Sequence, residues 1–213
     1  MNTGVVDAVS ILSLGRVFVA NMTGNVVFVG FAAASAPGFS LNASLWALGG
    51  FVAGAYFGGV LVRRIATHRG RLFAAAVVIE AVLLLAALII SAAGGKALTT
   101  ARIDAIAASA AAALGLQNAV VRELAVPDLT TSVLTMTLTG IAADTIPAGR
   151  GATIVRRALA VTAMFAGAII GALVVLHQGR TAGLSLALGL VGAVSIGALV
   201  VARKPRAWHT TGI

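Results

Sequence analysis

Apolar stretches about 20 residues long recur along the whole sequence, and they constrain its fold more than any other feature. About 20 apolar residues in a helix suffice to cross the hydrocarbon core of a bilayer. Hydrophobic residues make up 60% of the chain and charged residues only 10%, which leaves too few polar side chains to cover a soluble domain. We therefore expect one all-α membrane domain over residues 1–213, a polytopic helix bundle. Its clearest predicted spans are Leu45 to Val62, Leu72 to Ser91, Ile103 to Val121, Ala158 to Leu176 and Leu184 to Ala202.

The charged and reactive residues exclude several function classes. The 15 basic residues exceed the 6 acidic ones, but they lie in short loops and near the C-terminus, which is typical of membrane topology and not of a nucleic-acid-binding surface. The chain has no cysteine, and His68, His177 and His209 have no metal-ligand partner at helical spacing. We therefore predict no enzyme, no cofactor and no metal. A removable signal peptide is not expected either, because the N-terminus lacks a basic region and a small-residue cleavage site.

Two segments are apolar but interrupted. The first, Val5 to Ala34, is broken by Gly15, Arg16 and the polar run from Asn21 to Asn25. The second, residues 129–143, is a short segment that is rich in threonine. A segment of about 15 residues is short for a full crossing and fits a half-helix or re-entrant piece that the rest of the protein covers. Paired interrupted segments of this kind are typical of transporter binding sites.

Three short motifs of the first half of the sequence occur again in the second half, in the same order. The motif G-x-x-D-A at Gly4 returns as G-x-x-N-A at Gly115, Thr23-Gly24 returns as Thr139-Gly140, and Ala53-Gly54-Ala55 with Gly58 returns as Ala166-Gly167-Ala168 with Gly171. Chance matching of abundant alanine and glycine is the alternative. We predict a first repeat over residues 1–95, a second over 100–202 and a cytoplasmic tail over 203–213.

Loop charge predicts how these repeats are oriented. Cytoplasmic loops are enriched in Lys and Arg. Basic clusters lie near Arg63, Arg156 and Arg203, whereas residues 37–44 carry no charge. All three clusters lie inside if each half crosses the membrane three times. We therefore predict about six crossings as two inverted three-span repeats, each with a broken or re-entrant polar segment and with both termini cytoplasmic. Eight crossings with a parallel repeat are the alternative.

The polar side chains inside the apolar segments are the candidate site residues. We predict a binding site for a small solute between the two broken segments, with Arg122 as a gating residue and Asp7 and Glu80 as groups for ion or proton coupling, because intramembrane carboxylates are costly. The structural alternatives are Ser and Thr hydroxyls bonded to their own helix and a paired or neutral Glu80. The predicted substrate-binding residues are Asn21, Thr23, Gly24, Asn25, Gln117, Asn118, Thr131, Thr135 and Thr139.

Small residues are spaced at helical intervals on two of the predicted spans. Gly50, Gly54 and Gly58 share one helix face, and Ala163, Gly167 and Gly171 share another. Such faces let neighbouring backbones approach closely. We expect them to pack helices within the chain, and a homodimer through the same glycine-rich faces is the other use.

The motifs resemble the signature of the YoaK-like family of bacterial membrane proteins. The resemblance runs from Gly4 to Asn25, returns at Gly115 to Ala119, and includes Pro127 to Thr131 and Thr139-Gly140, so that it covers essentially the whole chain. It implies a multi-pass protein of the bacterial inner membrane with no established activity. Family members usually carry more sequence before the first motif, so we expect the first helix to be longer than the residues here.

Together these patterns predict a small-solute secondary transporter or facilitator whose partners are the lipid bilayer and an unidentified solute. The alternative is an accessory or scaffolding membrane protein without transport activity, which packs against a partner through its glycine faces.

Overall fold

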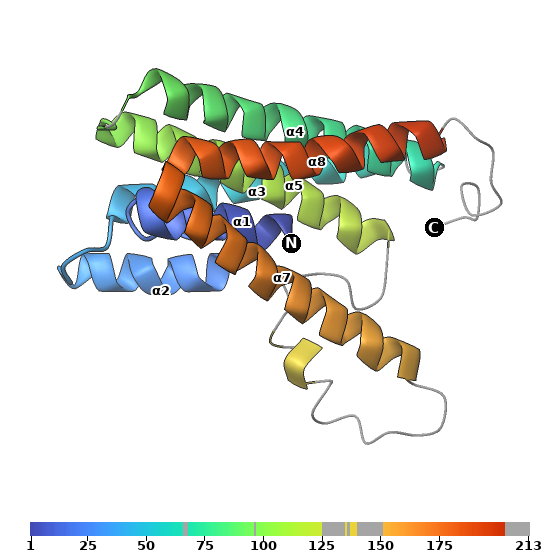
Figure 1. Cartoon of the computed structure of the whole chain (residues 1–213), viewed down its shortest axis with the longest axis horizontal. Helices are drawn as coiled ribbons and strands as arrows, with labels where there is room; N and C mark the ends of the chain where they lie inside the picture. Colours follow the sequence, from blue (N-terminus) through green and yellow to red (C-terminus); the bar gives the residue numbers. More distant parts are fainter. Residues whose placement is uncertain (66–67, 96, 125–134, 136, 140–150, 203–213) are drawn as a thin grey trace.

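The computed structural model describes residues 1–65, 68–95, 97–124, 135, 137–139 and 151–202. In this part of the chain the structure is all-helical, and no strand occurs. The helices are α1 (Asn2–Ser13), α2 (Met22–Ala33), α3 (Leu41–Ile65), α4 (Arg69–Ala93), α5 (Thr100–Leu124), α7 (Gly151–Gln178) and α8 (Arg180–Ala202) (Figure 1).

Five of these helices, α3, α4, α5, α7 and α8, are long and apolar enough to cross a membrane. Each contains one of the five predicted spans, so the prediction of an all-α polytopic bundle is confirmed. Each helix extends beyond its predicted span at one or both ends. A helix of 25 residues, such as α3, is about 37 Å long, compared with about 30 Å for the hydrocarbon core.

The long helices alternate in direction. Along the chain, α3, α5 and α8 run toward one end of the bundle, and α4 and α7 run away from it (Figure 1). We call it the basic end, because α3 ends there with Arg63 and Arg64 and α4 begins there with Arg69 and Arg71. α5 also ends and α7 also begins at this end. The described arginines of two predicted basic clusters therefore lie on one side of the bundle.

Close glycine contacts hold two helix pairs together. In the pair of α3 and α5, a Cβ atom at Gly54 would collide with the carbonyl oxygen of Ala112. In the pair of α1 and α7, a Cβ atom at Gly167 would collide with the carbonyl oxygen of Met1. The prediction that the glycine faces pack helices within the chain is confirmed. A homodimer through these faces stays a prediction.

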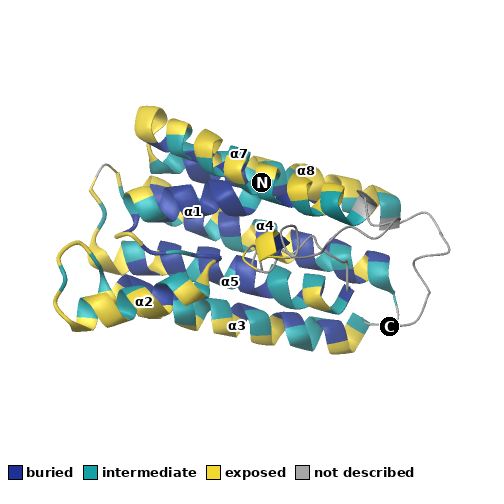
Figure 2. Cartoon of the chain, turned by 90° about the horizontal axis from the view of Figure 1, so that it is seen from below, coloured by how far each residue is buried: buried dark blue, intermediate teal, exposed yellow. Residues whose placement is uncertain are grey.

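The burial pattern fits a lipid-exposed bundle. Buried apolar residues of α1, α4, α5 and α8 form one core, whereas the outer faces of α3, α7 and α8 are largely exposed (Figure 2). The exposed side chains are large and apolar, such as Trp46, Tyr56, Phe165 and Ile196. Such extensive apolar surface would be a liability in water and is the expected lining of a helix that faces lipid.

Candidate functional site

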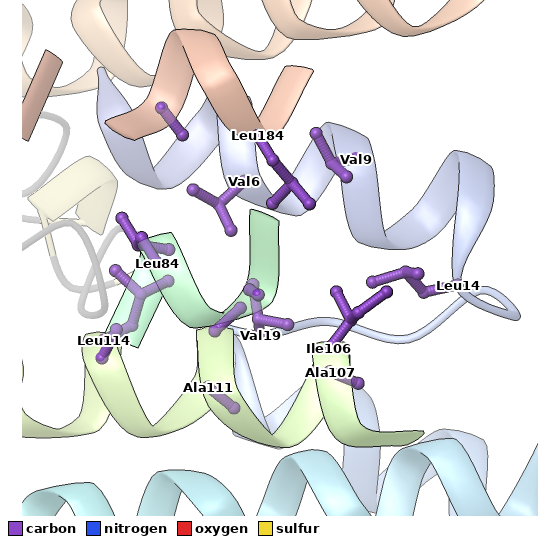
Figure 3. Close-up of a cluster of buried hydrophobic side chains, with 14 of the residues drawn as sticks. Val6, Val9, Leu14, Val19, Leu84, Ile106, Ala107, Ala111, Leu114 and Leu184 are labelled. Carbon is purple, nitrogen blue, oxygen red and sulfur yellow. The ribbon is translucent and has the colours of Figure 1, made fainter. Parts of the chain in front are cut away.

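The chain reverses twice between α1 and α2. Gly15 and Arg16 both have positive φ, 86° and 57°, and turn the chain back at the end of α1. Residues 17–20 then run back past α1 as an irregular segment, and α2 starts again in the direction of α1 (Figure 1). We call residues 17–20 the return segment. Val19 of this segment lies over α5, near Ala111, so the segment crosses the protein core (Figure 3).

Asp7 of α1 holds the end of the return segment. One carboxylate oxygen, Oδ1, accepts hydrogen bonds from the backbone N–H groups of Val19 at 3.1 Å and Ala20 at 3.2 Å. The side chain is only 5% exposed, and its other oxygen, Oδ2, has no hydrogen-bond partner among the described residues. Asp7 therefore satisfies two backbone donors that the break in the helix leaves free, and it keeps one buried oxygen unsatisfied.

Asn25 holds the other part of the return segment. Its side-chain oxygen accepts from the N–H of Phe18 at 2.9 Å, and its Nδ2 donates to the carbonyl oxygen of Phe18 at 2.6 Å. The residue is fully buried. Unsatisfied backbone groups are very costly inside a membrane, and the amide of Asn25 satisfies both groups of one residue at once.

The other polar residues of the first broken segment cap and fit α2. The exposed Asn21 is the N-cap, and its side chain accepts from the N–H of Gly24 at 3.4 Å. Gly24 lies under the ring of Phe18, so that a Cβ atom there would be 2.6 Å from the ring. Phe18 in turn stacks on Phe28, with 5.4 Å between the ring centroids. Thr23 is exposed.

Glu80 is the second buried carboxylate of the predicted site. It lies in the middle of α4, is 1% exposed, and accepts a hydrogen bond of 3.3 Å from Nδ2 of Asn2 on α1. The side-chain oxygen of Asn2 is buried and has no hydrogen-bond partner in the described part of the chain. Glu80 therefore contacts the start of α1 through Asn2, whereas Asp7 contacts the return segment.

The predicted residues of the second half lie elsewhere. Gln117 and Asn118 are half-buried on α5, where Nδ2 of Asn118 donates to the carbonyl oxygen of Leu114 at 2.9 Å. Arg122 is exposed near the basic end. Thr139 donates to the carbonyl oxygen of Thr135 at 2.9 Å, and both are exposed. Thr131 lies outside the described residues.

The described contacts therefore gather Asp7, Asn21, Gly24 and Asn25 around the return segment. Sequence reasoning missed Asn2 and Phe18, which are the partners of Glu80 and Asn25. No motif singles out Asn2, whereas Phe18 could have been suspected from its place directly before the polar run. Among the described residues, no group of three or more His, Cys, Asp or Glu side chains could hold a metal ion.

Comparisons with known proteins agree with this membrane architecture. The family described as "Protein of unknown function (DUF1275)" matches residues 1–197. The chain is also similar to the UPF0700 transmembrane protein YoaK of Bacillus subtilis (strain 168), with 42% identity over 62 residues, which span 29% of this chain and 28% of that protein. No solved structure gives a significant match. With its five membrane-length helices, the protein is a multi-pass membrane protein. The predicted resemblance is confirmed, and the chain belongs to the DUF1275 family.

Proposed function

We propose that the protein is a small-solute secondary transporter or facilitator with its polar site beside the broken helices. The observation that carries this proposal is the return segment, an irregular piece of backbone inside a membrane domain that Asp7 and Asn25 hold by hydrogen bonds. Irregular backbone at membrane depth is tolerated where protein or a water-filled cavity covers it, and transporters use it to bind substrate and ions.

Equivalent contacts in the two halves support an inverted repeat. The sequence echo aligns Gly4 with Gly115. A Cβ atom at Gly4 would collide with the carbonyl oxygen of Met164, and one at Gly115 would collide with that of Phe51. Met164 and Phe51 both lie three positions before the aligned glycines of α7 and α3. The same aligned positions therefore meet in both helix pairs.

The reciprocal contacts follow the same rule. Gly167 faces the carbonyl oxygen of Met1, and Gly54 faces that of Ala112. Met1 and Ala112 both lie three positions before the aligned glycines of α1 and α5. These two pairs of contacts join the same aligned positions and therefore support a duplication. In this duplication the first helix of each half packs on a helix of the other half, because α1 packs on α7 and α5 packs on α3.

Helix directions support the inversion and a count of six crossings. α1 runs away from the basic end, whereas its counterpart α5 runs toward it, and α3 and α7 differ in the same way (Figure 1). In this proposal α1, α3 and α4 form the first three-span repeat and α5, α7 and α8 the second. The basic end is cytoplasmic by the positive-inside rule.

Within this proposal the polar residues have distinct roles. Asp7 and Glu80 couple transport to an ion or a proton, and Arg122 gates access from the cytoplasm. Uncharged polar groups line the substrate site and favour a small polar or neutral solute. The proposed lining residues of the first half, Asn21, Thr23, Gly24 and Asn25, lie at or next to the return segment, whereas the described contacts do not bring those of the second half to it. The proposed residues of the second half are Gln117, Asn118, Thr131, Thr135 and Thr139. We infer no catalytic role for any of them.

The first test is the thermal stability of the purified protein against a library of small solutes and ions. A ligand that binds only the folded state raises the unfolding midpoint by mass action. We expect a shift that is specific to one class of solute and that is lost in Asn21→Ala. If no solute shifts the midpoint, the accessory-protein alternative gains support, and that alternative predicts co-purification with one partner.

The second test is uptake of the solute so identified into proteoliposomes. Asn21→Ala and Asn118→Ala, made separately, should abolish uptake while leaving expression intact. Gly49→Ala is a suitable control, since a Cβ atom at Gly49 meets no atom within 4 Å. Unchanged uptake in both asparagine variants would disprove a substrate site between the two broken segments.

A further inference from the structure

Asp7 holds the return segment more strongly when its carboxyl group is ionised. Both backbone N–H groups donate to Oδ1, and hydrogen bonds from N–H groups to an ionised carboxylate are about twice as strong as those between neutral groups. Val19 and Ala20 also directly precede Asn21, the N-cap of α2, so that the carboxylate lies close to the positive end of a helix dipole.

Protonation would weaken these two hydrogen bonds, because Oδ1 would become the oxygen of a neutral carboxyl group. The free oxygen, Oδ2, would receive the proton, because Oδ1 already accepts two hydrogen bonds. The resulting O–H group would be buried, and Oδ2 has no hydrogen-bond partner among the described residues. The same oxygen has no such partner in the ionised form either, where an unpaired buried charge is costly, so the site favours uptake of a proton. The hold of Asp7 on the return segment is therefore weaker when its carboxyl group is protonated.

From these contacts we propose that Asp7 is a proton-binding group, and that binding of one proton releases the return segment from α1. This inference rests on the proposed transport function and names the proton as its coupling ion. A metal cation fits the site poorly, because the groups that contact Asp7 are N–H donors, whereas hard cations require several oxygen ligands.

Few other charged groups face Asp7. The stretches of neighbouring helices that lie next to α1 are residues 164–175 of α7, 183–191 of α8 and 106–114 of α5, and they contain no titratable side chain. From α4, Glu80 faces α1 and is bonded to Asn2. Among the described residues, Glu80 is therefore the group to separate from Asp7 by experiment.

The absence of natural cysteines makes the release measurable. Val19→Cys places one thiol of similar size on the buried return segment, and Val9→Cys places one at an equally buried position on α1. Both variants are purified, and their labelling by a maleimide is followed at several pH values. Each rate is divided by the rate for the same variant denatured in detergent at the same pH, which removes the intrinsic effect of pH on the thiol.

We expect the corrected labelling of Val19→Cys to rise by about tenfold as Asp7 becomes protonated, the factor that corresponds to about 1.4 kcal/mol. Labelling of Val9→Cys should not change. In the Asp7→Asn background the labelling of Val19→Cys should be high at every pH, whereas in the Glu80→Gln background its pH dependence should persist.

Three results would overturn the proposal. These are labelling of Val19→Cys that does not depend on pH while Asp7 is intact, a pH dependence that survives in Asp7→Asn, and loss of the pH dependence in Glu80→Gln. The first comparison needs no substitution of Asp7 and stays decisive if Asp7→Asn fails to fold. Since the assay needs no solute, a failure of transport and a failure of this switch are seen separately.

Discussion

The amide of Asn25 forms hydrogen bonds with both backbone groups of Phe18, accepting from its N–H at 2.9 Å and donating to its carbonyl oxygen at 2.6 Å. The amide thereby pairs with the N–H and the carbonyl oxygen of Phe18, as a residue of a neighbouring strand would in a sheet. This pairing lets a non-helical residue lie inside a membrane domain without unsatisfied backbone groups. The polar residue is therefore a structural requirement of the break, whatever it contributes to binding.

Replacement of Asn25 by Ala should destabilise the protein more than replacement of Asn21. In Asn25→Ala both backbone groups of Phe18 lose their partner, at a cost of about 1–3 kcal/mol for each buried group. Replacement of the exposed N-cap Asn21 by Ala should lower the free energy of unfolding by about 1 kcal/mol. Thermal unfolding in one detergent measures both. An Asn21→Ala variant that is as unstable as Asn25→Ala would contradict the structural role of this amide.

Gly24 and Phe18 should be energetically coupled. A Cβ atom at Gly24 would lie 2.6 and 2.7 Å from two ring atoms of Phe18, so Gly24→Ala forces the ring to shift from its present stacked position on Phe28. Overpacking of this kind costs about 1–3 kcal/mol. In a Phe18→Leu background the same change should cost much less. A double-mutant cycle of unfolding free energies tests this coupling, and additive costs would show that the contact is unimportant.

The sequence predicted the five spans because a membrane helix depends on local composition. Each span needs about 20 apolar residues, and this requirement is visible without knowledge of any neighbour. The position of the first break was also predictable, since Gly15 and the run from Asn21 to Asn25 do not fit an uninterrupted apolar helix.

The partners across the site could not be predicted in this way. The contact of Glu80 with Asn2 joins residues that lie 78 positions apart, and neither residue has a motif that points to the other. Asp7 was singled out for its charge, but its bonds to Val19 and Ala20 depend on how tightly the chain reverses after Gly15. These contacts arise from tertiary structure, which a single sequence does not specify locally.

Gly54 and Gly167 should be equally intolerant of a larger side chain. In each case a Cβ atom would collide with a backbone carbonyl oxygen of the facing helix, which cannot move aside as a flexible side chain can. We expect Gly54→Ala and Gly167→Ala each to lower stability by about 1–3 kcal/mol.

Gly49→Ala is the matched control on α3, since nothing lies within 4 Å of its Cβ position. Alanine there should be neutral or slightly stabilising, by up to about 1 kcal/mol, because it favours the helix. Thermal unfolding of the three variants under the same conditions measures these differences. Loss of stability in Gly49→Ala alone would contradict the helix packing described for α3 and α5.

Glu80→Gln should fold at least as stably as the unchanged protein. The glutamine oxygen can still accept from Nδ2 of Asn2, and its amide can donate to the oxygen of Asn2, which is buried without a partner among the described residues. Glu80→Leu removes the acceptor, leaves the Asn2 amide unsatisfied, and should cost about 1–3 kcal/mol. Thermal unfolding separates the two variants. If Glu80 contributes to coupling, Glu80→Gln should also lose ion-dependent uptake in proteoliposomes while keeping its stability. Equal destabilisation by Gln and Leu would show instead that the charge of Glu80 itself stabilises the fold.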